Sequence, residues 1–218
     1  MTAARSYHQF CPVATALDAV GDRWALLVVR ELLLGPRRFH QLAEGLPGIS
    51  TDILTARLRA MESAGVVRRT GGARHGYELT GTGHALRPAL GELARWGASR
   101  VALPDSIDAV PPRLALTTLL LLPTEAPANV AGCFEVRAGD EMARIVIRDG
   151  TTTVLREEDA GHPDAAIELT HADLVSLLLG GRTRDKLRSG DLRIRGDRRA
   201  ARLLLDGLAA ASPLRDRA

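Results

Sequence analysis

Apolar residues recur every three to four positions through most of the first hundred residues, which is the period of an amphipathic helix. The pattern predicts helices over residues 12–20, between Asp22 and Gly35, and over 39–46, 51–64 and 81–101. Ser50 and Thr80 precede the last two, where a hydroxyl oxygen can accept a free backbone N–H. The apolar face of the fourth helix is predicted to consist of Ile53, Leu54, Leu58 and Met61.

Between the last two of these helices the pattern changes to that of a hairpin. Residues 66–69 and 77–79 are predicted as strands, and the Gly-rich segment 70–76 as the turn that joins them. A helix, a tight turn at Pro47-Gly48, a capped helix and a hairpin follow one another in the order of a winged helix-turn-helix.

The second half of the chain alternates between strands and helices. Strands are predicted over 130–138, 141–149, 151–157, 165–169 and 192–195, and helices over 113–122, 172–179, 184–188 and 198–211. Three prolines between Leu103 and Pro112 indicate a linker. We therefore expect an α+β protein: a winged helix-turn-helix DNA-binding domain over 1–103, a linker over 104–112, and a second domain over 113–218, with helices packed on an antiparallel-rich sheet.

The charge distribution favours a nucleic-acid partner for the first half. Residues 1–102 carry 13 arginines and eight acidic residues, whereas the remainder carries 16 basic and 18 acidic residues. No uncharged apolar run is long enough to span a membrane, and the polar N-terminus predicts a cytoplasmic protein without a membrane partner. No catalytic or metal-binding motif stands out, so neither an enzyme, a metal site nor a cofactor is expected.

Several segments of the first half resemble the HxlR family of bacterial regulators. The resemblance covers about residues 9–100 and rests on Cys11-Pro12-Val13-Ala14, Gly21-Asp22-Arg23-Trp24, the run from Arg30 to Phe39, Leu46-Pro47-Gly48-Ile49-Ser50, Leu54-Thr55-Ala56-Arg57-Leu58 and Ala64-Gly65-Val66-Val67. It implies a homodimer that binds double-stranded DNA and dimerises through the first and last helices of this domain.

The candidate DNA contacts follow from the helix-turn-helix reading. The N-terminal end of the second helix of such a motif meets base edges in the major groove, here with Ser50, Thr51, Asp52 and Thr55, followed by Arg57 and Arg59. Arg37 and Arg38 suit phosphates, and Arg74 and His75 at the hairpin tip suit the minor groove. Ser50 has the alternative of a plain helix cap, and the arginines that of solvated surface charges. A dimer predicts a near-palindromic operator with half-sites about one helical turn apart.

Two other residue types in the first half invite interpretation. Cys11 precedes a helix whose N-terminus favours a thiolate. Some proteins of the family that this chain resembles sense electrophiles or oxidants through a cysteine at this place. Cys11 is thus a possible redox sensor, or else a small residue packed at the dimer interface. Cys133 is expected to be an inert strand residue, and Trp24 and Trp96 are expected to pack in the core or in the dimer interface.

The second half resembles a sterol-carrier-protein-like domain. The resemblance rests on residues 166–174 and on the Gly-Asp-punctuated segment 187–197, and it implies an apolar tunnel for acyl chains or other lipophiles. The residues that we expect to line a pocket are Leu116, Leu120, Phe134, Ile145, Ile147, Leu174, Leu177 and Leu178. The alternative for these side chains is a filled core.

Three functions are therefore open. The first is a DNA-binding regulator, a repressor in the preferred reading, controlled by a small lipophilic effector in the second domain. The second is a regulator that senses oxidants or electrophiles through Cys11, with the second domain as a dimerisation module. The third belongs to another class, a lipid-binding carrier whose winged helix only dimerises.

Overall fold

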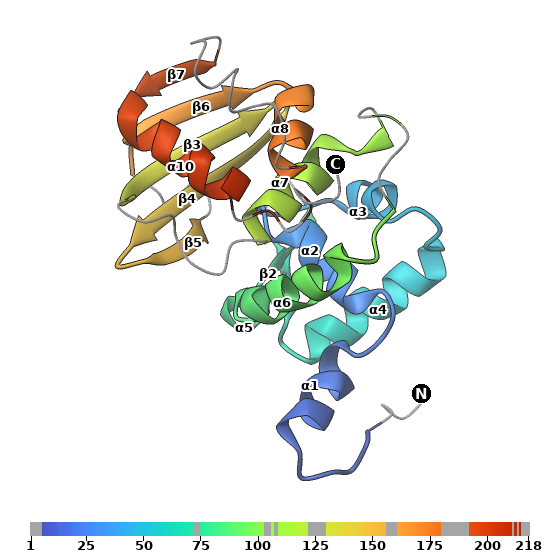
Figure 1. Cartoon of the computed structure of the whole chain (residues 1–218). Helices are drawn as coiled ribbons and strands as arrows, with labels where there is room; N and C mark the ends of the chain where they lie inside the picture. Colours follow the sequence, from blue (N-terminus) through green and yellow to red (C-terminus); the bar gives the residue numbers. More distant parts are fainter. Residues whose placement is uncertain are drawn as a thin grey trace. The chain divides into compact units, whose positions relative to one another are not determined.

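The computed structural model describes residues 6–71, 75–102, 106, 109–121, 130–155, 161–179, 192–210, 212 and 214. The chain divides into two compact units, Met1–Arg87 and Pro88–Ala218 (Figure 1). The linker predicted over 104–112 stays a prediction. It was inferred from the prolines in that segment, whereas the two units are defined by the contacts within each of them. Within the described residues, no helix is both long and apolar enough to cross a membrane.

The first unit contains a helix-turn-helix followed by a two-stranded wing. Its helices are α1 (Pro12–Val20), α2 (Ala25–Leu32), α3 (Phe39–Gly45) and α4 (Thr51–Ser63), close to the predicted ranges. The strands β1 (Val67–Thr70) and β2 (Gly76–Leu79) pair antiparallel. Arg37 adds a further bridge to the wing, because its backbone N–H donates to Tyr77 O at 2.9 Å and its carbonyl accepts from Tyr77 N at 2.8 Å.

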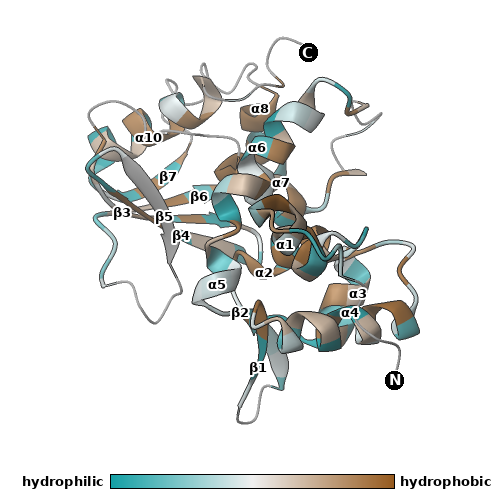
Figure 2. Cartoon of the chain, turned by 90° about the horizontal axis from the view of Figure 1, so that it is seen from below, coloured by the Kyte–Doolittle hydropathy of each residue, from teal (hydrophilic) through white to brown (hydrophobic). Residues whose placement is uncertain are grey.

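The core of the first unit is built mainly from aliphatic side chains. The largely apolar α2 contrasts with the polar β1 in Figure 2. Side chains from α2, α3, α4 and β2 are almost fully buried, namely Val28, Val29, Leu32, Leu42, Leu54, Leu58, Met61 and Leu79. Burial of aliphatic area on this scale is the main favourable contribution to the stability of such a unit.

The prediction of one long helix over 81–101 is wrong. The structure has a short helix, α5 (Gly81–His84), and a separate α6 (Arg87–Ala98). Thr80 caps α5 as expected, since its hydroxyl accepts from Gly83 N at 3.2 Å. Pro88 explains the break: proline lacks an N–H and is tolerated in the first turn of a helix but not in its interior.

One apolar residue lies elsewhere than predicted, and the structure decides between two positions for another. Ile53 was expected on the buried face of α4, but it is 43 % exposed. Successive residues turn by about 100° around a helix, so Ile53 points away from the stripe of Leu54 and Leu58. Trp96, predicted in the core or in the dimer interface, is 65 % exposed and is not part of the core, so the dimer interface stays a prediction. The guanidinium of Arg100 lies 4.2 Å from its ring centroid.

The second unit is a mixed five-stranded sheet with helices on one face. The strand order is β5-β4-β3-β6-β7, formed by β3 (Gly132–Ala138), β4 (Glu141–Arg148), β5 (Thr151–Leu155), β6 (Ala165–Leu169) and β7 (Arg193–Gly196). Only the β3–β6 pair among these neighbours is parallel, which confirms the expected antiparallel-rich α+β architecture. The unit also contains α6, α7 (Pro112–Leu121), α8 (His171–Leu178) and α10 (Arg198–Ala210). The helices α7, α8 and α10 pack on the sheet (Figure 1).

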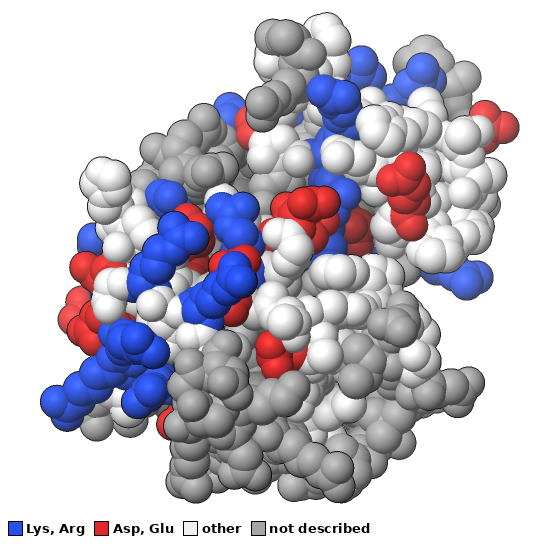
Figure 3. Space-filling view, turned by 90° about the horizontal axis from the view of Figure 1, so that it is seen from above, with Lys and Arg blue, Asp and Glu red and all other residues white. Residues whose placement is uncertain are grey.

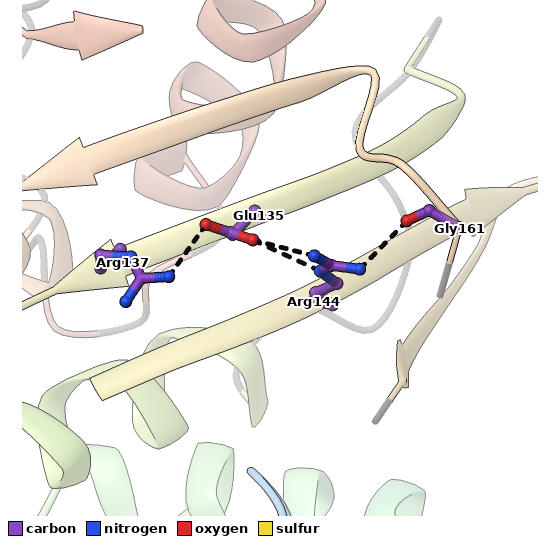
Figure 4. Close-up of polar contacts among 4 residues, drawn as sticks. All are labelled: Glu135, Arg137, Arg144 and Gly161. Atoms are coloured by element: carbon purple, nitrogen blue, oxygen red, sulfur yellow. Dashed lines mark hydrogen bonds and ion pairs between the residues drawn. The ribbon is translucent and has the colours of Figure 1, made fainter. Parts of the chain in front are cut away.

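Alternation along the strands separates a buried face from a polar face. The covered face carries Phe134, Val136, Ala138, Ala143, Ile145, Ile147, Ala165, Ile167 and Leu169. On the opposite face, Glu135 accepts from Arg144 at 3.2 Å and from Arg137 at 3.2 Å, and Arg144 also donates to the carbonyl of Gly161 at 3.0 Å (Figure 4). The polar contacts thus run across neighbouring strands on the side away from the core.

Caps fix the ends of two helices in this unit. Thr170 accepts from Asp173 N at 3.1 Å, and Asp173 accepts from Thr170 N at 3.2 Å, which is a reciprocal capping box at the start of α8. Asp197 caps α10 by accepting from the N–H groups of Arg199 and Ala200, both at 2.9 Å. The helical turn expected over 184–188 lies outside the described residues.

We expect Phe134→Ala to destabilise the second unit by about 3–5 kcal/mol, because it removes a fully buried ring and leaves a cavity. The measurement is urea unfolding followed by far-UV circular dichroism. Leu203→Ala on the exposed side of α10 is the matched control and should change stability by about 0.5 kcal/mol or less. Equal effects of the two substitutions would contradict this placement of Phe134.

Candidate nucleic-acid interface

A tight turn between α3 and α4 sets up the candidate interface. Arg38 has extended backbone angles before α3, and its N–H donates to the Gln41 side chain at 2.9 Å. After α3, Gly48 adopts a φ of 89°, a conformation that disfavours side chains other than glycine. Ser50 then caps α4, because its hydroxyl accepts from Ile53 N at 3.3 Å.

The N-terminal end of α4 presents polar side chains to solvent. Ser50, Thr51 and Asp52 are exposed, and Thr55 is half-buried. The opposite side of the helix is held in the core by Leu54, Leu58 and Met61. Arg59 lies on the exposed side. The structure therefore brings Ser50, Thr51, Asp52, Thr55 and Arg59 to one accessible end and side of a helix.

Arg57 differs from Arg59 because it is already engaged within the unit. Its guanidinium lies 3.0 Å from the carboxylate of Asp22, which precedes α2, and its side chain is 31 % exposed. This ion pair joins α4 to the α1–α2 connection. A phosphate contact by Arg57 must compete with Asp22, whereas the described structure gives the side chain of Arg59 no ion pair.

A buried ion pair holds α2 against the end of α3. Glu31 is 4 % exposed and lies 2.9 Å from Arg30, whose guanidinium also donates to the carbonyl of Gly45 at 3.3 Å. A Cβ atom on Gly45 would collide with the Glu31 carboxylate. The absence of a side chain at Gly45 therefore lets α3 end directly over this ion pair, just before the turn into α4.

The structure describes only some of the basic residues predicted to contact DNA before α3 and in the wing. Arg38 and His75 are exposed and Arg37 is half-buried, but Arg74 lies outside the described residues. The arginines of β1 were not among the predicted site residues. Arg68 pairs with Glu78 at 2.6 Å, and Arg69 pairs with Glu62 at 3.0 Å. Their position in a strand beside acidic residues is the signal that would have identified them as structural.

Exposed basic side chains also occur in the second unit, although its net charge is slightly acidic. The arginines of β7 and of the first turns of α10 are exposed, namely Arg193, Arg195, Arg198, Arg199 and Arg202. Figure 3 shows Lys and Arg side chains gathered on part of one face of the molecule. The net charge of a half therefore does not describe its surface. The exposed arginines of the second unit weaken the prediction that only the first half suits an anionic polymer.

The eight candidate pocket residues come together in the core of the second unit. Leu116 and Leu120 lie on α7, Phe134 on β3, Ile145 and Ile147 on β4, and Leu174, Leu177 and Leu178 on α8. All are between 0 % and 5 % exposed. Their burial is compatible with lining a closed apolar site and with filling a core.

Both cysteines are free and half-buried. Cys11 is the residue before α1, and its carbonyl accepts from the N–H of Thr15 at 3.0 Å. Cys133 lies on β3, on the polar face of the sheet, opposite Val146. Burial raises the pKa of the Cys133 thiol, and the charge of Arg144 opposes this shift.

A capped recognition-type helix, a tight glycine turn and a wing define a winged helix-turn-helix protein of the kind that regulates transcription. Residues 19–103 match the HxlR-like helix-turn-helix model, and residues 124–205 match the SCP-2 sterol transfer family. The chain belongs to the HxlR-like helix-turn-helix family, and it carries a second region similar to SCP-2 proteins.

Curated relatives support this assignment. An uncharacterized HTH-type transcriptional regulator of Synechocystis sp. is 38 % identical over 92 residues, which are 40 % of this chain and 68 % of that protein. The regulator YvaP of Bacillus subtilis is 39 % identical over 93 residues, covering 40 % of this chain and 86 % of YvaP. Among solved structures, the redox regulator HypR in its oxidized form is 30 % identical, over 43 % of this chain and all of HypR, with a TM-score of 0.40.

We expect Cys133 to react slowly with iodoacetamide at neutral pH. A raised thiol pKa leaves less thiolate, so in the Cys11→Ser variant the alkylation rate should have its midpoint above the ordinary value of about 8.5. The rate is measured by mass spectrometry between pH 6 and 10, with glutathione as the reference thiol. A midpoint below that of a free cysteine would contradict the burial of this thiol.

Proposed function

We propose that this protein is a homodimeric transcriptional repressor that binds duplex DNA through α4 and the wing, under the control of a small lipophilic ligand. The observation that carries the proposal is the accessible end of α4. Its polar residues Ser50, Thr51 and Asp52 are exposed, while the other side of the helix is fixed in the core. A rigid helix with a free polar N-terminal end suits the major groove.

Each candidate contact has a role in this proposal. Ser50, Thr51, Asp52 and Thr55 read base edges, with Ser50 also capping the helix. Arg59 contacts a phosphate or a guanine edge, and Arg57 contacts DNA only if it leaves Asp22. Arg37 and Arg38 bind phosphates, and Arg74 and His75 enter the minor groove. The macrodipole of α4 adds a favourable interaction with phosphates near its N-terminus.

Exposed apolar side chains support a homodimer. The segment before and within α1 exposes Tyr7, Phe10, Val13 and Leu17, and α6 exposes Leu93 and Trp96. Large apolar side chains left exposed within a segment indicate that this segment contacts another surface. A second copy is the proposed occupant, which gives a two-fold symmetric protein and a near-palindromic operator with half-sites about one helical turn apart.

The proposal also assigns different roles to the two halves of the chain. The match to the HxlR-like family ends at residue 103, and the match to the SCP-2 family begins at residue 124. These limits support a DNA-binding and dimerisation domain over 1–103, a linker over 104–112 and a ligand-binding domain over 113–218. The ligand site is lined by the eight buried residues on α7, β3, β4 and α8. A DNA-binding repressor of a bacterium acts in the cytoplasm.

We propose a regulator rather than an enzyme, because the curated relatives are named as transcriptional regulators. Redox control through Cys11 is a second proposal for regulation. The free thiol of Cys11 lies between the exposed apolar residues Phe10 and Val13, at the surface proposed for dimerisation. A thiol oxidant should then weaken DNA binding by the wild type but not by the Cys11→Ser variant.

We expect Arg38→Gln and Arg59→Gln each to lower the salt dependence of DNA binding. Removing one phosphate contact per protomer removes two per dimer, so the slope of log K against log salt should fall by about 1.8. The measurement is fluorescence anisotropy at several KCl concentrations with a duplex selected from a random-sequence pool.

The matched control for this experiment is Arg202→Gln, which removes an exposed arginine of α10. It should leave both the affinity and the slope unchanged. If the variants of Arg38 and Arg59 also bind DNA like the wild type, the proposed interface is wrong; if the wild type itself binds no duplex, the lipid-carrier alternative is favoured.

We expect native mass spectrometry of the full-length protein to show a dimer with one lipophilic molecule per protomer. Phe10→Ser should shift the population towards monomers, because it removes an exposed ring from the proposed interface. Leu174→Phe should reduce ligand occupancy by overfilling the site, whereas Leu203→Phe on the exposed side of α10 should not. A dimer without any bound mass after gentle extraction from cells would count against ligand control.

A further inference from the structure

Ile53 is a large aliphatic side chain on the part of α4 that faces solvent. It follows the exposed residues Thr51 and Asp52 in the first turn and is 43 % exposed. Single exposed aliphatic residues are common on protein surfaces. Ile53 differs from them by its place, since it lies at the end of the helix proposed to enter the major groove. A β-branched residue also offers no gain in helix propensity there.

The residue three positions further along extends this apolar surface. Ala56 is exposed, and the two positions are separated by about 60° around the helix and 4.5 Å along it. The small side chain of Ala56 keeps the helix surface low beside Ile53, so that the backbone can approach a groove closely. Neither residue can make a hydrogen bond through its side chain, so this surface is suited to an apolar feature of the DNA.

In the major groove, the apolar feature of a base pair is the 5-methyl group of thymine. Hydroxyl and charged residues read the donors and acceptors of the other base edges. Thr51 and Thr55 also carry methyl groups, but both lie on the other flank of the exposed face of α4, by the 100° step of the helix. A methyl group on the flank of Ile53 therefore meets this side chain rather than the threonines.

We propose that Ile53 determines specificity by packing against the 5-methyl group of a thymine in each half-site, with Ala56 allowing the close approach. This inference rests on the proposed function, because it requires that α4 enters the major groove. It adds an apolar element to a site that otherwise consists of polar and charged side chains. It predicts that each half-site contains a thymine whose methyl group contributes to affinity.

The test compares thymine with uracil, which differs from it by the methyl group alone. A duplex is selected from a random-sequence pool with the full-length protein, and each thymine is then replaced singly by deoxyuridine. At one position in each half-site, we expect the dissociation constant to rise about fourfold, and about fifteenfold when both half-sites are substituted. The readout is fluorescence anisotropy at constant salt.

Variants assign this sensitivity to the side chain. Ile53→Ala should bind the thymine and uracil duplexes equally, Ile53→Val should retain part of the difference, and Leu203→Ala should behave like the wild type. Thermal melting by circular dichroism checks that the variants fold, and Ile53→Val decides the outcome if Ile53→Ala does not bind.

The outcomes separate this inference from the proposed function. Loss of the thymine–uracil difference in Ile53→Ala, or a smaller difference in Ile53→Val, supports the inference. A selected duplex without any uracil-sensitive position, or with an undiminished difference in both Ile53 variants, overturns it and leaves DNA binding intact. Failure to select any duplex from the pool overturns the proposed function and the inference together.

Discussion

The rotation of α4 about its own axis is the constraint on which the candidate interface depends. Leu54, Leu58 and Met61 occupy a single stripe and are almost fully buried, so the helix cannot turn without exposing aliphatic area. The same stripe decides which residues face outward, including Asp52, Ala56 and Arg59. A DNA-reading surface of this kind is thus defined indirectly, by the side chains that point the other way. Ser50 adds a second constraint, since its cap fixes where the helix begins and which N–H groups remain free.

Ion pairs separate the arginines that hold the fold together from those that are available to a partner. Arg30 is engaged with the buried Glu31 and the end of α3, and Arg57 is engaged with Asp22. Removing one partner of a buried pair leaves an uncompensated charge, so Arg30 is tied to its structural role. An exposed pair such as Arg57–Asp22 contributes less and exchanges more readily for a phosphate. Composition alone cannot make this distinction, because both kinds of arginine occur within the same basic half of the chain.

The sequence predicted the local structure well and the long-range structure less well. Caps such as Ser50 and Thr80 mark helix starts by short-range chemistry, and both were placed correctly. The break between α5 and α6 was missed although Pro88 signals it, because a proline in the first turn of a new helix resembles one inside a long helix. The parallel pairing of β3 with β6 joins strands some thirty residues apart, and hydropathy along the chain carries no information on such partners. The exposure of Ile53 and Trp96 likewise depends on which neighbours the fold supplies.

Ligand control of the kind proposed requires that the second unit has two states with different affinities for the ligand. Within this unit, α8 is the element whose displacement by a ligand would change contacts with the segment before α7. His171, the first residue of α8, lies with Nε2 at 2.5 Å from the carbonyl oxygen of Val110, so the segment before α7 is tied to α8. The same helix contributes Leu174, Leu177 and Leu178 to the candidate ligand site. A displacement of α8 by a ligand therefore acts on Val110, which lies in the predicted linker towards the DNA-binding half. Because α8 contacts both the candidate ligand site and Val110, it is the element of this unit through which the proposed ligand control would act.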